Sequence, residues 1–266
     1  MSESAFGLDA YLQRIRYTGE RNPTLATLSA LHEHHAAAIP FENLDVRLGR
    51  PIRLDLESLQ AKLVAGRRGG YCFEQNTLFA AALRQLGFAV DTLEARVRPE
   101  GVTAILPRTH MILRVRTEGA DYLADVGFGG DGPLRPVPLS GEVTEQPIAA
   151  CQVVPEGKLL VLRRRRGGTW TDQYAFGPEP ALPIDYEVAN HFTSTYPRSP
   201  FLHTATLQLS TAEARHILRG PTYTRQNPDG DEVRQLTTDE TLALIRDLFR
   251  LDLPEEDLRR ALGERG

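Results

Sequence analysis

The sequence predicts an α+β protein, with helices in the first third, strands in the middle and a mixed last segment. Up to about Gly87 the apolar residues recur at helical spacing, and from Phe88 to about Tyr186 they alternate with a period of two. A proline-rich stretch follows, and beyond it both patterns occur. Neither an internal repeat nor a low-complexity segment interrupts this order.

Helices are expected where apolar residues at helical spacing are preceded by a capping residue or followed by a residue that ends a helix. Asp9 precedes the first stripe and Asp55 the third, so both are candidate N-caps. The stripe over residues 25–31 cannot continue past Pro40, because proline lacks the amide hydrogen that a helix needs. Near the C-terminus, residues 237–240 have the spacing of a capping box ahead of a last apolar stripe.

Turn motifs divide the middle region at residues 99–101, 118–119, 156–157 and 167–168, each of which contains glycine. Short alternating runs between such turns predict antiparallel strands, in a barrel or a sandwich. The basic run Arg163–Arg166 is expected to be a solvated hairpin end. The alternative for this run is attraction of a phosphorylated substrate.

Composition excludes several classes of protein. The 31 basic and 35 acidic residues leave a net charge of −4, which disfavours a general nucleic-acid binder and gives no indication of a membrane-surface protein. Cys72 and Cys151 are the only cysteines, which is too few for a disulfide framework and suits a reducing compartment. The first seven residues lack the features of a signal peptide, and no apolar run is long enough to span a membrane. We therefore expect a cytoplasmic globular protein.

Residues 68–76 carry the most informative pattern in the chain, Arg-Gly-Gly-Tyr-Cys-Phe-Glu-Gln-Asn. The two glycines allow a tight turn, and a helical stripe over 79–86, ended by Gly87, places Cys72 at or near a helix N-terminus. Unpaired N–H groups and the helix macrodipole stabilise a thiolate there, which makes Cys72 a candidate nucleophile. The alternative is a buried cysteine that packs as a small apolar residue.

A nucleophilic cysteine needs a base, and His110 is the candidate. His110 begins the predicted strand 110–115, whose alternation places it on the face opposite to most of the apolar side chains. His32, His34 and His35 lie on a predicted helix and are expected to be solvated. The alternative for His110 is a core histidine with both ring nitrogens hydrogen-bonded.

Asp125 is the candidate partner that orients the imidazole. The strand that begins at His110 is expected to turn back along residues 122–126. A turn centred on the 117/118 bond pairs His110 directly with Asp125, and one centred on the 118/119 bond places them on a diagonal of the same face. Both registers keep the side chains within roughly 5.5–8 Å, whereas a slip by one residue would put them on opposite faces. The alternative for Asp125 is a turn residue at a strand end.

Residues 127–132, Gly-Phe-Gly-Gly-Asp-Gly, match the G-x-G-x-x-G pattern of dinucleotide-binding folds and follow a predicted strand. That fold requires a helix next, but three prolines within residues 133–138 are incompatible with one. We therefore reject a dinucleotide site. The glycines are expected instead to form a wall beside the active site, where backbone approaches a ligand closely.

These residues together indicate a family. The chain resembles the arylamine N-acetyltransferases at residues 39–44 (Ile-Pro-Phe-Glu-Asn-Leu), at 68–76, at His110, at 122–129 and within 189–201. The matches occur in the family's order over nearly the whole chain, and their joint specificity is high.

The resemblance implies a Cys-His-Asp triad at Cys72, His110 and Asp125, with no metal. It implies that acetyl-CoA, as co-substrate, donates an acetyl group to the cysteine, which passes it to an arylamine, arylhydrazine or hydrazide in ping-pong order. It also implies a catalytic core related to papain and the transglutaminases, with Cys72 in the first of three domains and the other two residues in the second. The three domains are a helical domain at 1–87, a β-barrel domain at 88–188 and an α/β lid at 189–266.

Phe41, Phe128 and Phe201 are candidate walls for a flat aromatic substrate, and Gly129 is expected beside them. The alternative for each phenylalanine is core packing.

Glu42 and Arg68 are expected to form an ion pair that supports the catalytic loop rather than taking part in the chemistry. Tyr196 departs from the family pattern, because many relatives carry a histidine there. The departure leaves the contacts between the lid and CoA undefined, and it leaves the triad unaffected.

Other functions use the same triad. A hydrolase or transglutaminase-like enzyme would admit water or a peptide, and an amide synthase would close a ring from a carrier-bound acyl chain. A non-enzymatic interaction protein is disfavoured, since it would need no three aligned catalytic residues. The expected partners are acetyl-CoA and a small aromatic amine or hydrazine, without nucleic acid or membrane, for a monomer or weak homo-oligomer.

Overall fold

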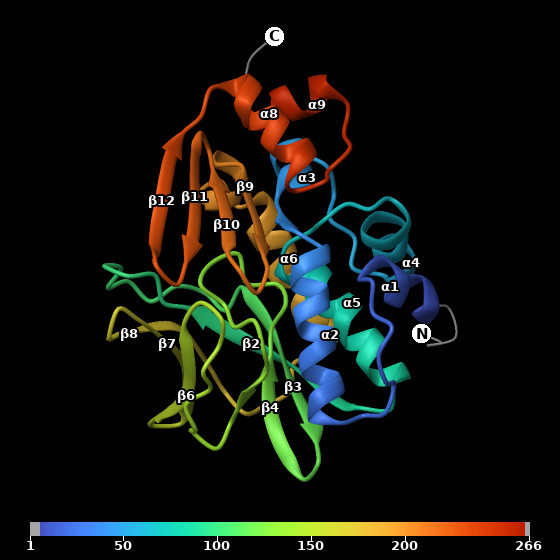
Figure 1. Ribbon diagram of the computed structural model, residues 1–266, viewed down its shortest axis with the longest axis vertical. Coiled ribbons are helices and arrows are strands. Elements are labelled where there is room, and N and C mark those ends of the chain that lie inside the picture. The colour runs from blue at the N-terminus through green and yellow to red at the C-terminus, as the bar shows by residue number, and fades with distance from the viewer. Residues whose placement is uncertain (1–5, 264–266) are drawn as a thin grey trace.

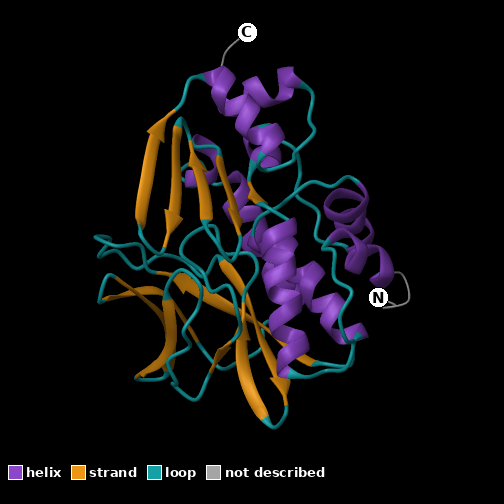
Figure 2. Ribbon diagram, in the orientation of Figure 1, coloured by secondary structure: helices purple, strands orange, loops and turns teal. Residues whose placement is uncertain are grey.

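The computed structural model describes residues 6–263 and contains two antiparallel sheets flanked by helices (Figure 1). Helices come first, strands occupy the middle and both occur in the last segment, so the predicted α+β class is confirmed. Figure 2 shows the helices gathered along one side and at one end, with most strands on the opposite side.

The first region is helical, and its helices begin close to the predicted residues. Asp55 caps its helix as predicted, because its carboxylate accepts a hydrogen bond from Ser58 N–H at 2.8 Å. Asp9 is not a cap: the first helix begins one residue earlier, and Asp9 lies in its first turn, where a negative charge is still favourable. The elements of this region are α1 (Leu8–Arg14), α2 (Leu25–Ala38), β1 (Phe41–Glu42), α3 (Leu44–Arg47), α4 (Leu56–Leu59), the π-helix η2 (Gln60–Ala65) and α5 (Cys72–Gln85).

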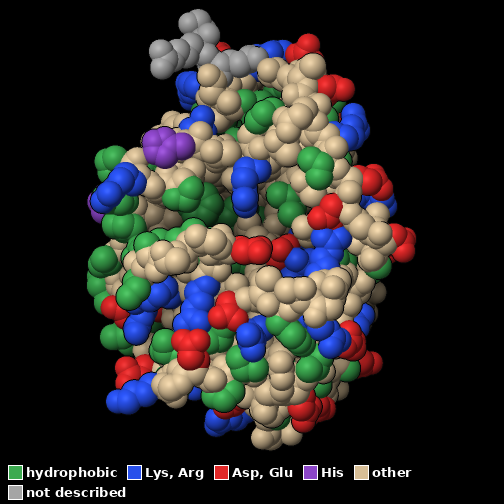
Figure 3. Space-filling model, turned by 90° about the vertical axis from the view of Figure 1, so that its left-hand side faces the viewer, with side chains coloured by type: hydrophobic (Ala, Val, Ile, Leu, Met, Phe, Trp, Pro, Cys, Tyr) green, Lys and Arg blue, Asp and Glu red, His purple; other side chains and the backbone are tan. Residues whose placement is uncertain are grey.

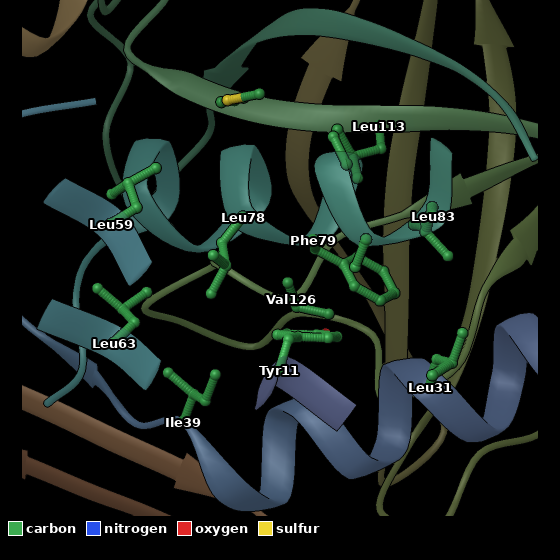
Figure 4. Packing of buried hydrophobic residues seen from close by; sticks show 14 of the residues in the cluster. Tyr11, Leu31, Ile39, Leu59, Leu63, Leu78, Phe79, Leu83, Leu113 and Val126 are labelled. Carbon is green, nitrogen blue, oxygen red and sulfur yellow. The ribbon is translucent and has the colours of Figure 1, made fainter. Parts of the chain in front are cut away.

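The core of this region surrounds α5. Phe79 and Leu83 of α5 pack with Tyr11 of α1 and Leu31 of α2, and Leu113 of strand β3 (His110–Thr117) belongs to the same buried cluster (Figure 4). All five side chains are fully buried. Helices enclose α5 on one face and strand β3 encloses it on another. This close packing fixes the N-terminus of α5 relative to β3.

The histidines of α2 contradict the prediction that they are solvated. His32 and His35 are fully buried, and His34 is half-buried. The ring nitrogens of His35 bond to Tyr11 Oη at 2.8 Å and to Gln75 Oε1 at 3.1 Å. Helix α2 is covered on several sides and lacks the single apolar stripe of a surface helix, so sequence periodicity could not separate its buried from its exposed positions.

The middle region is a nearly closed seven-stranded antiparallel barrel in the order β5-β4-β3-β2-β8-β7-β6, with β5 lying against β6. The alternation predicted to continue to about Tyr186 is wrong at its end, because the last strand of the barrel stops at Phe176 and Tyr186 lies in helix α6 (Pro183–Thr195). Proline occupies the first turn of α6, where its missing N–H is tolerated. The strands are β2 (Ala89–Val97), β3 (His110–Thr117), β4 (Ala120–Ala124), β5 (Val137–Pro138), β6 (Ala150–Glu156), β7 (Leu159–Arg166) and β8 (Thr169–Phe176).

The last region builds a second sheet, β1-β9-β10-β11-β12, that borrows its first strand from the helical region. Phe41 of β1 pairs with Gln208 of β9. The capping box at Thr237 and Glu240 is confirmed, and α6 runs across the predicted domain boundary at 188/189. The elements are α6 (Pro183–Thr195), α7 (Pro200–His203), β9 (Thr206–Ser210), β10 (Arg215–Arg219), β11 (Thr222–Asn227), β12 (Gly230–Gln235), α8 (Thr238–Asp247) and α9 (Glu255–Leu262).

Alternate arginines of the run at the end of β7 face the second sheet. The prediction of a solvated hairpin end therefore holds for Arg163 and Arg165, whose side chains are 40% and 38% exposed, and is wrong for Arg164 and Arg166. Arg164 is 5% exposed and pairs with Asp131 at 2.6 Å, and Asp131 also pairs with Arg215 of β10 at 3.1 Å. Arg166 pairs with Asp231 of β12. Alternate arginines point toward the second sheet because side chains along a strand alternate in direction. The run therefore joins the two sheets.

Charges of both signs are mixed on the face of the molecule shown in Figure 3. Within residues 6–263, every helix is too short or too polar to cross a bilayer.

Asp131→Asn is expected to lower the free energy of unfolding by about 3 kcal/mol, because two buried guanidinium groups then lose their shared carboxylate. Urea unfolding at constant pH measures the change. Asp252→Asn alters an exposed carboxylate and is the matched control, with an expected change below about 0.5 kcal/mol. Equal stabilities of the Asp131→Asn variant and the unmodified protein would contradict the role of Asp131 in joining the sheets.

Candidate active site

Cys72 is the first residue of α5, as the sequence predicts. Tyr71 before it has an extended backbone, and its N–H donates to Glu74 Oε2 at 3.0 Å, which stabilises the helix end. The N–H groups of the first helical turn have no partner within the helix, so they are available to an anion. The cysteine is only 5% exposed. A thiolate here has favourable backbone electrostatics and little contact with water.

The register of β3 and β4 places His110 and Asp125 on a diagonal of one face. Leu113 pairs with Ala124 and Thr117 with Ala120, so the turn is centred on the 118/119 bond. This is the second of the two registers that the sequence left open. His110 Nε2 and Asp125 Oδ2 lie 2.7 Å apart, and both side chains are buried.

The carboxylate of Asp125 accepts four hydrogen bonds. Oδ2 accepts from His110 and from Tyr174 Oη at 2.9 Å, and Oδ1 accepts from Asn76 Nδ2 at 2.9 Å and from Gly127 N–H at 3.0 Å. A carboxylate has about four acceptor positions, so every one of them is used. Asp125 is thereby held ionised and in one orientation.

Charge and hydrogen bonding lower the pKa of Asp125 and raise the pKa of His110. Burial alone would raise the pKa of Asp125, but the His110 charge and the hydrogen bonds lower it below its usual value. Burial alone would lower the pKa of His110, but Asp125 and Cys72 raise it to about 10. The folded pKa of His110 exceeds the unfolded value, so the pair stabilises the fold fully below about pH 6.5 and loses that contribution as pH rises toward 10.

Cys72 lies within hydrogen-bonding reach of the His110 ring. Because Nε2 is bonded to Asp125, Nδ1 is the ring nitrogen left for the thiol. The Cys72 Sγ also lies 3.8 Å from the carbonyl oxygen of Thr109, the residue before His110. The site thus contains a thiol, an imidazole beside it and a carboxylate hydrogen-bonded to that imidazole, an arrangement that can support nucleophilic acyl transfer.

Aromatic rings enclose the imidazole. The His110 ring centroid lies 4.9 Å from that of Phe128 and 5.0 Å from that of Tyr174. These rings restrict water around the imidazole, which strengthens its interaction with Asp125. Phe128 is therefore packed against the proposed base.

Phe41, Phe201 and Gly129 come together on another side of the site. The rings of Phe41 and Phe201 lie 6.0 Å apart. A Cβ on Gly129 would lie 2.4 Å from the Phe41 ring, and one on Gly127 would lie 2.7 Å from Cys72 Cα, so both positions require glycine. The glycine segment packs against the cysteine and Phe41, and the next element is strand β5, which confirms the rejection of a dinucleotide fold.

A cavity of about 20 Å³ lies between Phe41 and Phe128, and Asp125 also lines it. Gln208, Ser210 and Arg215 of the second sheet also line it. The volume suits one water molecule, so the cavity is smaller than an aromatic ring.

Glu42 and Arg68 form the expected ion pair. Arg68 Nε and Nη2 both donate to Glu42 Oε1, at 2.9 and 2.6 Å. The other oxygen of Glu42 accepts from Leu44 N–H at 2.8 Å. This pair joins β1 to the loop before Cys72.

Three polar residues at the site were not assigned from the sequence: Asn76, Tyr174 and His32. Asn76 lies one helical turn after Cys72, so its spacing within the 68–76 motif could have indicated a shared helix face. Tyr174 comes from β8, far away in the chain, and no local pattern predicts its contact. His32 accepts from the N–H of Asp125 at 3.1 Å and donates to the carbonyl of Leu134 at 2.9 Å. Burial lowers the pKa of His32 to about 4, which keeps it neutral.

This chain is similar to known N-acetyltransferases. A family model described as N-acetyltransferase matches residues 24–258. The arylamine N-acetyltransferase of Mycolicibacterium smegmatis is 39% identical over 256 residues, which cover 94% of this chain and 93% of that protein.

Solved structures agree with the sequence similarity. Nocardia farcinica arylamine N-acetyltransferase superposes with a TM-score of 0.91 at 44% identity, covering 98% of this chain and 95% of the other. The Mycobacterium marinum enzyme in complex with CoA has a TM-score of 0.91 at 33% identity, covering 96% and 98%. The superpositions confirm the predicted papain-like core.

Iodoacetamide should alkylate Cys72 rapidly well below pH 8.5, the region where an ordinary cysteine ionises. His110→Gln should move the midpoint of the pH profile upward, because the thiolate loses its cationic partner. Mass spectrometry of peptides reads both cysteines at once, and Cys151 is the internal control. Burial raises the pKa of Cys151 to about 11, so it should stay unmodified. A Cys72 midpoint near 8.5 that His110→Gln leaves unchanged would contradict activation by this histidine.

Proposed function

This chain belongs to the arylamine N-acetyltransferase family, and from this premise we propose that it moves an acetyl group from acetyl-CoA through a Cys72 thioester to an arylamine, arylhydrazine or hydrazide. Acetyl transfer follows from the family. The thioester, the ping-pong order, the acceptor class and the role of each residue are the proposal.

The observation that supports it most is the line of three buried side chains, Cys72, His110 and Asp125. A hydrogen bond of 2.7 Å joins the histidine to the carboxylate, and the ring also reaches the thiol. Acyl transfer through a covalent intermediate needs a nucleophile, a base and a group that fixes the base. In this proposal Cys72 is the nucleophile, His110 the proton carrier and Asp125 the orienting group.

The first half-reaction exchanges one thioester for another. The Cys72 thiolate attacks the acetyl carbonyl of acetyl-CoA, and the oxygen becomes an oxyanion as the new C–S bond forms. In this proposal the backbone N–H of Cys72, at the start of α5, stabilises that oxyanion. The bond from carbon to the CoA sulfur then breaks, and His110 gives its proton to the leaving thiolate. The overall change is nearly balanced in energy, because the bond type is unchanged.

The second half-reaction makes the amide. Aromatic amines are mostly neutral at pH 7, so the nitrogen lone pair can attack the acetyl-cysteine carbonyl directly. The C–N bond forms, the bond to Cys72 breaks, and the proton from nitrogen passes to His110. The products are an N-acetylated amine and the starting thiolate–imidazolium pair.

The environment of Cys72 favours an amine over water as acceptor. The sulfur is nearly buried, and aromatic side chains surround the base, which limits hydrolysis of a thioester. We assign Phe41, Phe128 and Phe201, with Gly129, as walls for the aromatic acceptor. The cavity between Phe41 and Phe128 has room for about one water molecule, so the acceptor would enter by displacing the Phe128 side chain.

The CoA complex of the Mycobacterium marinum relative supports acetyl-CoA as the donor. A reaction that depends on a free thiol suits the reducing cytoplasm, where we place the enzyme.

Acetyl-CoA without an amine should leave one acetyl group on the protein, detectable by intact-mass spectrometry. Cys72→Ala should abolish it, and Cys151→Ala, at the other buried cysteine, should not.

With amine present, double-reciprocal plots at several amine concentrations should be parallel, because the two substrates react in turn. Intersecting lines, or acetylation that persists in Cys72→Ala, would refute the thioester route.

Asp125→Asn should lower kcat by at least about a hundredfold while the fold persists, by analogy with other triads. The amide keeps the shape but cannot carry the charge that balances the imidazolium. Asp121→Asn is the matched control, because Asp121 lies on the same hairpin and pairs with Arg116 at 2.8 Å instead. Near-native turnover in Asp125→Asn would remove Asp125 from the proposed mechanism.

A further inference from the structure

A chain of buried charges joins the N-terminus of α5 to the segments around it. Lys62 Nζ lies 2.7 Å from Glu74 Oε1 and 2.7 Å from Asp45 Oδ2. Asp45 Oδ1 lies 3.3 Å from Arg68, which also pairs with Glu42. All five side chains are less than one-fifth exposed. Lys62 thus connects Glu74, on the helix that carries Cys72, to the group formed by Asp45, Arg68 and Glu42.

Lys62 is unusual in this sequence and in its setting. Only two of the 31 basic residues, Lys62 and Lys158, are lysines. Lys62 lies in the π-helix η2, a rare conformation that is frequent at functional sites. Its carbonyl oxygen accepts from Arg68 N–H at 3.1 Å, so the same residue also holds the start of the loop that leads to Cys72. A compact ammonium on a flexible stem can bridge two carboxylates that approach from different directions.

Glu74 has two opposite effects on Cys72. Its Oε2 accepts from Tyr71 N–H, which fixes the backbone immediately before the cysteine. Its negative charge, two residues from Cys72 in the same helical turn, disfavours a thiolate there. Burial raises the pKa of Glu74, and Lys62 opposes that rise. For Lys62, burial alone would lower the pKa, but Glu74, Glu42 and Asp45 raise it above its usual range.

We propose that Lys62 is a positioning residue for Cys72: it holds the Glu74 carboxylate in the capping position and cancels the field of that carboxylate at the thiolate. This inference rests on the nucleophilic role proposed for Cys72. Among the described residues, His110 of β3, Tyr71 before α5 and Tyr186 of α6 also interact electrostatically with the cysteine. They belong to no ion pair with Lys62, so substitutions at position 62 leave them in place.

The test is the pH profile of Cys72 alkylation by iodoacetamide in three variants. Lys62→Met leaves Glu74 unbalanced and should raise the midpoint by about half to one pH unit. Glu74→Gln leaves Lys62 charged and still paired with Asp45, and should lower the midpoint by a similar amount. Lys62→Arg keeps the charge and should keep the native midpoint. If Lys62 had a merely structural role, Cys72 would be alkylated more slowly in both neutral variants, but their midpoints would not move in opposite directions.

Controls make the result decisive. Lys158→Met changes the other lysine, which is exposed in the turn between β6 and β7, and should have no effect. In the double variant Lys62→Met/Glu74→Gln neither charge remains, so the midpoint should return to within about 0.3 pH unit of native. If Lys62→Met does not fold, Glu74→Gln and the double variant still test the proposal.

Midpoints of Lys62→Met and Glu74→Gln on the same side of native, or both equal to native, would overturn the proposal. The assay contains neither acetyl-CoA nor amine. Its failure is therefore distinguishable from failure of the proposed acetyl transfer, which the acetyl-enzyme experiment measures separately.

Discussion

The buried carboxylate of Asp125 is the constraint on which the rest of the site depends. A charge with almost no exposure must be paired and hydrogen-bonded, since an unpaired one costs several kcal/mol. Its four donors come from β3, β8, α5 and its own loop, so the requirement to satisfy one side chain aligns three separate elements. The position of His110 beside Cys72 follows from that alignment.

Helix α5 lies between two charged networks. On the barrel side are Asp125 and His110, and on the helical side is the chain of charges that Lys62 links to Glu74. In our proposal the first network places the positive charge of His110 beside the Cys72 thiolate. The second cancels the negative charge of Glu74, the residue that caps the helix. Both networks are buried, where effective dielectric constants are low and each charge has a long reach. Small changes in either are expected to alter the reactivity of Cys72.

The two sheets are tied together close to this site. Asp131 lies in the glycine segment that packs against Cys72, and it is shared by Arg164 of the barrel and Arg215 of the second sheet. Strand β1 pairs with β9 and carries Phe41, so the second sheet also positions one proposed wall of the acceptor site. The last third of the chain is therefore joined to the proposed catalytic segment through ion pairs and strand pairing.

Local physics let the sequence by itself determine the helical start at Cys72, the alternation that orients His110, the α+β order and the absence of a dinucleotide fold. These follow from neighbours within a few residues, through glycine turns, helix ends, strand periodicity and proline geometry. Only the tertiary structure selected one of the two hairpin registers and placed His32 and His35 in the interior. It also directed Arg164 and Arg166 toward the second sheet and brought Tyr174 to Asp125. Those outcomes depend on which distant surface covers a residue, and the energy of burying a polar group is set by partners that local sequence does not contain.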